Sequence, residues 1–515
     1  MFLSLIINFI FNHILVTLIV LIIILICVYF SNYFRICYYV SKINGPRAYP
    51  IIGNSTLFRG TLEEATKVFF QLSNEYAPIT RFWIGPVPLV IVMDPKIIKE
   101  ILYNQNALEK AWFMKLIMKC VLGNTILISE VPKWKRNRNI INQGFTLSIL
   151  KSYFKIFEGN IDTLSDILDN ELNNERFFDI YGILSKTTLE AVCASSMRLD
   201  MKFQQDQSNS SYFEAIHSSM HMMSARLMNP LKLPNIFYQF TQDYKKLMGY
   251  KNEVYAIARD AISTKRKEQI TMDDTLIDFK SENNNEIKKP LLDYLIDFTK
   301  SNPDFTDEEM ADEINLTIIA AYETTARTVS MVLLILALYK DMQNKVCEEL
   351  FQMLGESNEN KINFDDLSKL KYMEMVIKEA LRLFPAIPLI ARQLTEDVTM
   401  GNYTIPKGTN IGIPIFALHR NEAYWEEPLK FDPERFTFEN IKKQNPYAFI
   451  PFSAGPRNCL GVRYAWIFMK LALSRLLSKY EFHTNIKDLS EIKFEFEISL
   501  KIINGYPIRI TPRQR

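Results

Sequence analysis

Hydrophobic positions recur every three to four residues over most of this chain, which is the spacing of helices that bury one face. This spacing dominates the segment 147–267 and returns at 367–384 and 462–480. A long helix is expected over 306–339, because a threonine followed by acidic residues opens it. The pattern therefore predicts a mainly helical protein.

Extended apolar runs are short and few by comparison. A strand pair is expected from 79–82 and 89–93, a hairpin-like turn at 403–409, and an alternating β-region at 494–512. The expected fold class is thus mainly α with small β-sheets (α+β).

The N-terminal segment is the most apolar part of the chain. Its first 32 residues carry no fixed charge, and Ile14–Phe30 with its flanks is long enough to cross a bilayer as a helix. A signal peptide would show a basic start and a small-residue cleavage site, and neither is visible. The first cations follow the segment, at Arg35, Lys42 and Arg47. The positive-inside rule then predicts that the remainder faces the cytosol.

The domain organisation follows from this segment and the stretch after it. Two prolines and two glycines between residues 45 and 54 predict a stiff, non-helical lead-in. We divide the chain into a membrane anchor at 1–34, a basic, proline-rich hinge at 35–54, and a single globular domain at 55–515. No linker, repeat or low-complexity stretch divides the body.

Composition narrows the function classes. The chain has 515 residues, 48% hydrophobic and 23% charged, with a net charge of +2, so nucleic-acid binding has no electrostatic support. None of the six cysteines shows a CxxC spacing. This argues against a zinc site and a disulfide framework, and it fits a reducing compartment.

One loop, Phe452–Gly461, carries the strongest candidate chemistry. Cys459 lies just before a predicted helix, whose N-terminus favours a negatively charged thiolate, a good ligand for a soft metal. Gly455 and Gly461 would let a flat, bulky group approach the backbone, and Arg457 could pair an acidic group. An isolated cysteine would more often be a buried free thiol.

The pattern Phe-x-x-Gly-x-Arg-x-Cys-x-Gly resembles the haem-binding signature of the cytochromes P450, the haem-thiolate monooxygenases. The resemblance runs from the lead-in nearly to the C-terminus, and it implies the cytochrome P450 fold, with haem between the long central helix and the cysteine loop. It implies haem b, bound non-covalently, with Cys459 as the axial ligand of the iron. Phe452, Gly455 and Gly461 would contact the cofactor.

Further residues take family roles by the same resemblance. Trp134 and Arg138, four apart on one helical face, would hydrogen-bond a haem propionate. Arg392, which closes an extended apolar segment, and Arg457 would pair the propionates. Their order along the chain, rather than any single motif, carries this assignment.

The central helix contains Ala320-Ala321-Tyr322-Glu323-Thr324-Thr325. It resembles the family motif in which an acid and an alcohol, here Glu323 and Thr324, relay protons during dioxygen activation. Ala321, counted among the residues that contact haem, stands where the family usually has glycine. Ala320 stands where the fatty-acid ω-hydroxylases often carry a haem-linked glutamate, so no covalent link is expected.

A structural triad is also implied. Glu379 and Arg382 lie three apart on a helix, and the family ties such a pair to a later arginine, here Arg435 in Pro433-Glu434-Arg435-Phe436. His419 lies in the same region, and we expect a structural role for it.

The implied function is hydroxylation or epoxidation of a lipophilic substrate with O2, using NADPH electrons from cytochrome P450 reductase, with cytochrome b5 as a second candidate donor. The expected location is the endoplasmic reticulum membrane, crossed once. Fatty acids, sterols and xenobiotics all remain candidate substrates, and Arg382-Leu383-Phe384-Pro385 and Ala417-Leu418-His419-Arg420 favour the fatty-acid-hydroxylase branch. The alternatives are a haem-thiolate isomerase or dehydratase without need of O2, which usually lacks the threonine kept here, and a non-catalytic membrane haem-binding protein.

Two groups of apolar residues leave a choice open. Met220, Met222, Met223 and Met228 could form a substrate-entrance lid that dips into the membrane, or a hydrophobic helix end. In the apolar stretch 107–130, Phe113, Leu116 and Ile117 could line a pocket, although core packing is expected for each residue alone.

Overall fold

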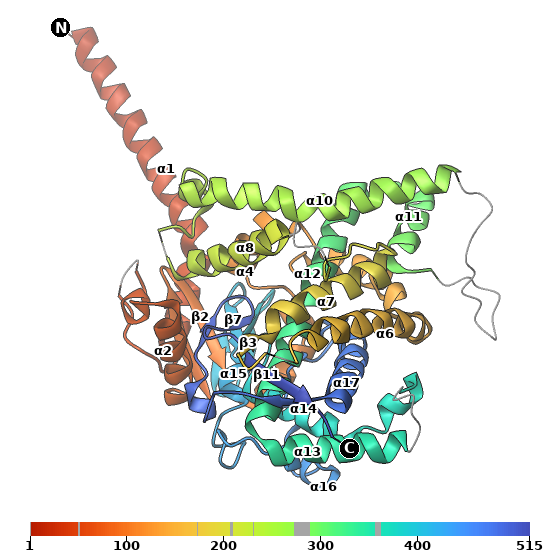
Figure 1. Ribbon diagram of the computed structural model, residues 1–515. Helices are drawn as coiled ribbons and strands as arrows, with labels where there is room; N and C mark the ends of the chain where they lie inside the picture. The colour runs from red at the N-terminus through yellow and green to blue at the C-terminus, as the bar shows by residue number, and fades with distance from the viewer. Residues whose placement is uncertain are drawn as a thin grey trace.

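The computed structural model describes residues 2–49, 52–172, 174–205, 210–229, 231–271, 289–355 and 362–514. It is built mostly from helices, with several small sheets between and beside them (Figure 1). This confirms the mainly helical class with small β-sheets that the hydrophobic spacing predicts.

The described part of the N-terminal half contains ten helices, from the apolar helix α1 to the long helix α10. Their bounds are α1 Phe2–Ser41, α2 Leu62–Glu75, α3 Pro95–Tyr103, α4 Trp112–Leu122, α5 Val131–Ile141, α6 Leu147–Asp169, α7 Ile180–Met197, α8 Ser210–Met228, α9 Asn235–Tyr238 and α10 Gln242–Thr271. The helices of the C-terminal half are α11 Leu291–Ser301, α12 Asp307–Leu338, α13 Lys340–Leu354, α14 Lys371–Leu383, α15 Ile415–Leu418, α16 Phe438–Ile441 and α17 Val462–Lys479.

The strands form several small sheets. The largest has the order β1-β2-β7-β4, with β1 Ile79–Ile84, β2 Val87–Val92, β7 Asn410–Ile413 and β4 Ile390–Gln393. The others are β3-β11-β8, β9-β10 and β5-β6, with β3 Phe178–Asp179, β5 Val398–Met400, β6 Tyr403–Ile405, β8 Tyr480–His483, β9 Phe494–Phe496, β10 Leu500–Ile502 and β11 Pro507–Pro512. In the largest sheet β1 and β2 pair antiparallel and β2 and β7 pair parallel.

The long central helix α12 starts where the sequence predicts. Its N-cap is Thr306, whose hydroxyl accepts a hydrogen bond from the Glu309 amide at 3.2 Å. The acidic first turn also suits the positive end of the helix dipole. Most of the helix is buried, so it passes through the protein rather than along its surface.

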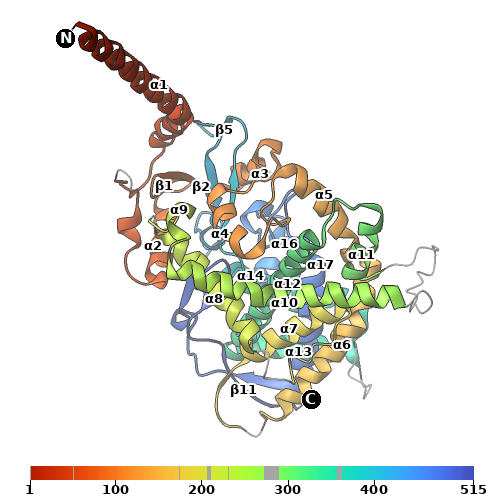
Figure 2. The same ribbon diagram turned by 90° about the horizontal axis from the view of Figure 1, so that it is seen from above.

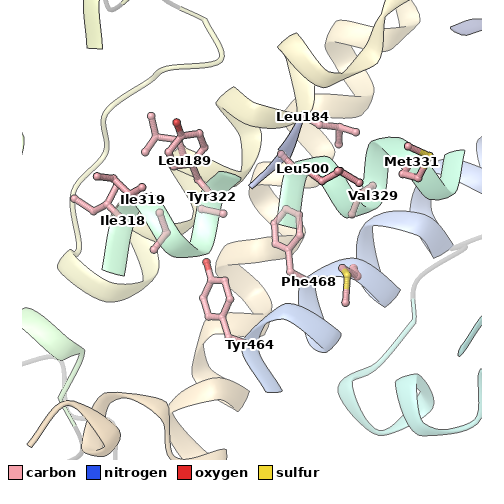
Figure 3. Close-up of a cluster of buried hydrophobic side chains, with 14 of the residues drawn as sticks. Leu184, Leu189, Ile318, Ile319, Tyr322, Val329, Met331, Tyr464, Phe468 and Leu500 are labelled. Carbon is pink, nitrogen blue, oxygen red and sulfur yellow. The ribbon is translucent and has the colours of Figure 1, made fainter. Parts of the chain in front are cut away.

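The core around α12 is formed largely by α7 and α17. Figure 3 shows Leu184 and Leu189 from α7, Tyr322 and Val329 from α12, and Phe468 from α17 gathered in one cluster. These side chains are nearly inaccessible to solvent. The packing fixes α12 relative to α17, the helix that follows the cysteine loop.

Helix α1 projects away from the body (Figures 1 and 2). Two parts of it, Asn12–Val28 and Phe30–Ser41, meet at a bend of 44° and together are long and apolar enough to cross a membrane. Within the described residues α12 passes the same test, but 83% of its most apolar window is buried, as expected for a core helix.

The first residues of the predicted basic hinge are helical in the structure. Residues 35–41 continue α1 as helix, because Ile36 and Val40 are buried against the body. The non-helical lead-in therefore begins after Ser41.

The structure partly decides whether the methionine group forms a substrate-entrance lid or a hydrophobic helix end. Met220 and Met223 are buried in the core, which favours the helix-end interpretation for them, and the side chain of Met228 lies outside the described residues. Phe113 and Ile117 are likewise buried core residues, whereas Leu116 lines a cavity.

Candidate haem-thiolate site

The cysteine loop is a closed turn at the N-terminus of α17. The amide of Cys459 donates to the Phe452 carbonyl at 3.0 Å, and the amide of Asn458 donates to the Gly455 carbonyl at 3.1 Å. Cys459 is solvent-accessible. Protein atoms nevertheless surround it densely enough that burial raises the pKa of its thiol, while the Gly461 amide and Arg138 act in the opposite direction. A bound metal cation would lower that pKa and hold the thiolate.

The two glycines of the loop differ in the space that surrounds each of them. Gly455 has φ +73°, and a Cβ there would lie 2.1 Å from the Leu102 carbonyl oxygen. Its missing side chain thus accommodates the protein backbone, which differs from the predicted close approach of a flat group. A Cβ on Gly461 would meet nothing within 4 Å, so the space beside it is open. Phe452 packs near Trp466, with ring centroids 6.3 Å apart.

Arg457 is a buried cation with spare donors. Its Nη2 donates to the Ser129 carbonyl at 2.6 Å, and its guanidinium lies over the Trp134 ring at 4.6 Å. Nε and Nη1 are buried and have no hydrogen-bond partner among the described residues. Burial, together with repulsion from Arg392, lowers the pKa of Arg457 to about 9. An orphaned, buried guanidinium is costly unless an anion satisfies it.

Arg392 and Arg138 are the other two arginines predicted to hold the haem propionates. Arg392 is 1% exposed, and burial lowers its pKa to about 10. Within the described residues its side chain makes one hydrogen bond, from Nη1 to the Ala391 carbonyl at 3.2 Å. Arg138 donates to the carbonyl and to Oδ1 of Asn458 at 2.8 and 3.0 Å, which joins α5 to the cysteine loop.

Lys110 is a further cation that sequence reasoning missed. Burial, followed by repulsion from Arg392 and Arg457, lowers the pKa of Lys110 well below its ordinary value. Within the described part of the chain, none of these four cations forms an ion pair. The sequence feature that could have indicated Lys110 is the presence of a lysine inside the apolar stretch before α4. The cluster fits a dianionic group such as the two propionates of haem.

The structure does not bring the side chains of Glu323 and Thr324 together. Thr324 donates from Oγ1 to the Ala320 carbonyl at 2.7 Å. Neighbouring residues on a helix point about 100° apart, so the two side chains face different surroundings. Ala320 is exposed and Ala321 is half-buried.

Glu323 is held on the other side of α12. Its Oε1 accepts from Nη2 of Arg327 at 2.9 Å and from the Ser499 hydroxyl at 2.9 Å. The Tyr181 ring lies 5.2 Å from the Arg327 guanidinium. Neither Arg327 nor Ser499 was identified from the sequence. Arg327 four residues after Glu323 was the visible signal for an ion pair.

Glu379, Arg382 and Arg435 meet in the structure. Arg382 donates from Nε and Nη2 to the two oxygens of Glu379 at 2.7 and 2.8 Å, and both side chains are fully buried. Nε of Arg435 lies 3.4 Å from Oε1 of Glu379.

The triad also reaches the segment before the cysteine loop. Arg382 donates to the His419 carbonyl at 2.8 Å, and Nε2 of His419 accepts from the Ile450 amide at 3.0 Å. Burial lowers the pKa of His419 to about 3, so the ring is neutral and can accept this bond. The expected structural role of His419 agrees with these contacts.

Comparison with known proteins identifies the family. The model of the cytochrome P450 family matches residues 43–508. The chain therefore belongs to the cytochrome P450 family, whose members are monooxygenase oxidoreductases.

Individual relatives agree over nearly the whole chain. Cytochrome P450 4c3 of Drosophila melanogaster is 29% identical over 93% of this chain and 91% of its own length. Cytochrome P450 4c21 of Blattella germanica is 30% identical over 88% of this chain and 91% of its own. Human cytochrome P450 4V2 is 29% identical over 91% of this chain and 89% of its own.

Proposed function

We propose that this chain binds haem b through the Cys459 sulfur and uses it to insert one atom of O2 into a lipophilic substrate. The observation that carries the proposal is the cluster of Arg138, Arg392, Arg457 and Lys110 beside the cysteine loop, none of which forms an ion pair with another residue that the structure describes. Haem bound through the Cys459 sulfur would supply O–O cleavage and oxygen insertion. The cations would neutralise the propionates by charge-assisted hydrogen bonds, and Trp134 would add to this set.

The role of the protein in proton supply falls to two residues of α12. Thr324 lies one turn from the exposed Ala320, so its hydroxyl can turn from the helix carbonyl toward a substrate. Glu323 would hold and release protons while Arg327 and Ser499 fix its carboxylate. The methyl group of Ala321 would leave less space for O2 beside this face of α12 than a glycine would.

Electrons would come from NADPH through a membrane-bound reductase, with cytochrome b5 as a second donor. Lys135, Lys442, Lys443 and Arg463 are exposed and could attract an acidic partner to the cysteine side. Arg136 is already engaged in an ion pair with Glu309.

The proposed location is the endoplasmic reticulum membrane, with α1 crossing it and the body in the cytosol. Residues 12–28 of α1 expose their apolar side chains. A second exposed apolar group in and around α9 would rest on the same bilayer, formed by Leu231, Ile236, Phe237 and Phe240. Apolar substrates dissolved in the membrane would then lie near α9. The similarity to relatives named cytochrome P450 4c3, 4c21 and 4V2 favours the fatty-acid-hydroxylase branch.

The test is a carbon-monoxide difference spectrum of the reduced, purified protein. We expect a thiolate-type band that disappears in Cys459→His, and a Cys459→His protein that kept the band would refute the assignment. Substrate oxidation that requires reductase, NADPH and O2 together separates the monooxygenase from an isomerase or dehydratase. Haem binding without turnover would instead favour the non-catalytic alternative.

A further inference from the structure

A histidine and two glutamates from distant parts of the chain meet outside the set of residues assigned to haem. His221 belongs to α8, whereas Glu495 lies in β9 and Glu497 directly follows that strand. One possible ligand atom from each of the three residues lies within 4.8 Å of the other two. The closest pair is Nδ1 of His221 and Oε1 of Glu497, at 3.2 Å. We name these three residues the His221 cluster.

The geometry of the β9–β10 hairpin places both carboxylates on one face. Successive side chains of a strand point to opposite faces, so Glu495 and Glu497 point to the same one. Lys501 stands opposite Glu495 in the register and reaches the two glutamates at 2.7 and 3.2 Å. Apart from His221, it is the only ion-pair partner of either glutamate in the part of the chain that the structure describes. Two carboxylates thus share one ammonium group, which leaves an excess of negative charge.

Glu497 also offers an unused ligand atom in a buried position. Its side chain is 2% exposed. The contacts with His221 and Lys501 both use Oε1, and Oε2 makes no hydrogen bond within the described residues. A buried carboxylate oxygen without a donor has lost its water and gained no hydrogen bond in return. A cation would satisfy this oxygen, so the observation points to a ligand independently of the proximity of the three side chains.

The ligand types indicate which cation the His221 cluster would bind. Imidazole suits zinc and neighbouring transition metals, whereas magnesium and calcium prefer sites made of oxygen alone. One histidine nitrogen and two carboxylate oxygens form a set of three ligands that leaves a position for water. His217, one turn before His221, packs against the Tyr181 ring with centroids 6.0 Å apart, so we assign it no ligand role.

We propose that His221, Glu495 and Glu497 form a binding site for a zinc-type divalent cation, which links α8 to the β9–β10 hairpin. Lys501 occupies the carboxylates until the cation displaces it. The Lys501 side chain is 39% exposed, so its ammonium group can move into solvent when the cation arrives. The site does not rest on the proposed function, because no residue assigned to haem takes part in it.

The link would reach the central helix, because the same hairpin contacts the ion pair of α12. The Ser499 hydroxyl donates to Glu323, and the Leu500 carbonyl accepts from Nη1 of Arg327 at 3.2 Å. A cation that binds the folded protein and not the unfolded chain stabilises the fold as its occupancy rises. Zinc should therefore raise the melting temperature of the protein.

Isothermal titration of the purified full-length protein in detergent with ZnCl2 tests the site. We expect His221→Gln to raise the Kd of Zn²⁺ about 10-fold or more, since even the outer partners of metal ligands are worth that much. The His221 side chain is 53% exposed, so this variant should fold. ZnCl2 should also raise the Tm of the parent protein more than that of His221→Gln, and MgCl2 at the same concentration should leave both unchanged.

Two further variants separate a metal site from a purely structural cluster. Lys501→Met removes the competing ammonium group and should lower the Kd of Zn²⁺. A lysine that only held the hairpin together would instead leave the Kd unchanged or raise it. His483→Gln is the matched control, because His483 lies with Lys340 and Glu481 in a cluster that has a single carboxylate among the described residues. This variant should not change the Kd.

An equal Kd of Zn²⁺ in the parent protein and in His221→Gln would overturn the proposal and assign the zinc to other groups. Equal binding of MgCl2 and ZnCl2 would also overturn it, because that result describes a carboxylate pair without the histidine. The carbon-monoxide band should be the same in the parent protein and all three variants. A missing band in every protein would count against the proposed function and leave the result for the metal site intact.

Discussion

Glu323 and Arg327, one turn apart on α12, form a buried ion pair with 2.9 Å between Oε1 and Nη2. Replacing Arg327 by Met leaves the carboxylate buried without its counter-ion. The expected loss in free energy of unfolding is about 3–5 kcal/mol. The double variant Glu323→Gln with Arg327→Met should recover most of this loss. Urea denaturation of the parent protein, Arg327→Met, Glu323→Gln and the double variant measures the coupling free energy between the two side chains. If the effects of the two single variants simply add, the side chains are not coupled and the prediction is contradicted.

The glycines of the cysteine loop should respond differently to alanine. Gly455→Ala places a Cβ against the Leu102 carbonyl at positive φ, so we expect a loss of stability of about 1–3 kcal/mol. Gly461→Ala meets open space and should cost less than about 1 kcal/mol, yet it should lower the haem content of the purified protein. Thermal denaturation and the ratio of haem to protein distinguish them. Similar stability losses in both would show that the two positions do not differ in this way.

The buried pair of Glu379 and Arg382 should matter far more than an exposed pair of similar spacing. Arg382→Ala is expected to cost about 3–5 kcal/mol and to reduce haem retention, since four carbonyl and carboxylate partners lose their donor. Lys430→Ala removes an exposed partner of Glu427, also three residues away, and should leave the free energy of unfolding almost unchanged. Equal losses of stability in the two variants would contradict a role of burial.

Glu313 should make stability depend on pH near neutrality. Burial raises its pKa from 4.5 to about 7, against the opposing effect of hydrogen bonds from the Asn137 side chain and the Ile126 amide. Nearby, Lys133 lowers this pKa and Glu309 raises it. Between these two pH values the folded protein holds a proton that the unfolded protein has released.

The free energy of unfolding should therefore fall as pH rises from about 4.5 to about 7, by up to about 3 kcal/mol from this group. Glu313→Gln should flatten the profile over that window, because the amide cannot titrate. Urea denaturation at several pH values, with the parent protein in parallel, measures the difference. An unchanged slope in Glu313→Gln would assign the dependence to other groups.

The sequence was most informative where a local rule decided the outcome. The predicted helix 306–339 agrees with α12 at both ends, because Thr306 caps it and the helical spacing continues to its end. The same holds for the strand pair β1–β2, in which two short apolar runs flank a Gly-Pro turn. The contact of Glu379 with Arg435 came from the family resemblance and from no local rule.

Long-range partners could not be predicted. The Ser499 hydroxyl reaches Glu323 from a hairpin 176 residues later, and no pattern in either segment indicates the other. The family resemblance implied a joint action of Glu323 and Thr324, although helix geometry directs their side chains apart. Lys110 was missed because its importance lies in the two arginines that folding places around it.

The last turns of α1 are fastened to the body at several points. The Tyr33 hydroxyl donates to the Pro86 carbonyl at 2.8 Å, Arg35 pairs with Asp397, and Ile36 and Val40 are buried. Because of these contacts, the last turns of α1 have a fixed orientation relative to the body. If its outer part lies in a bilayer, the bend of 44° sets the tilt of the whole body over the lipid plane.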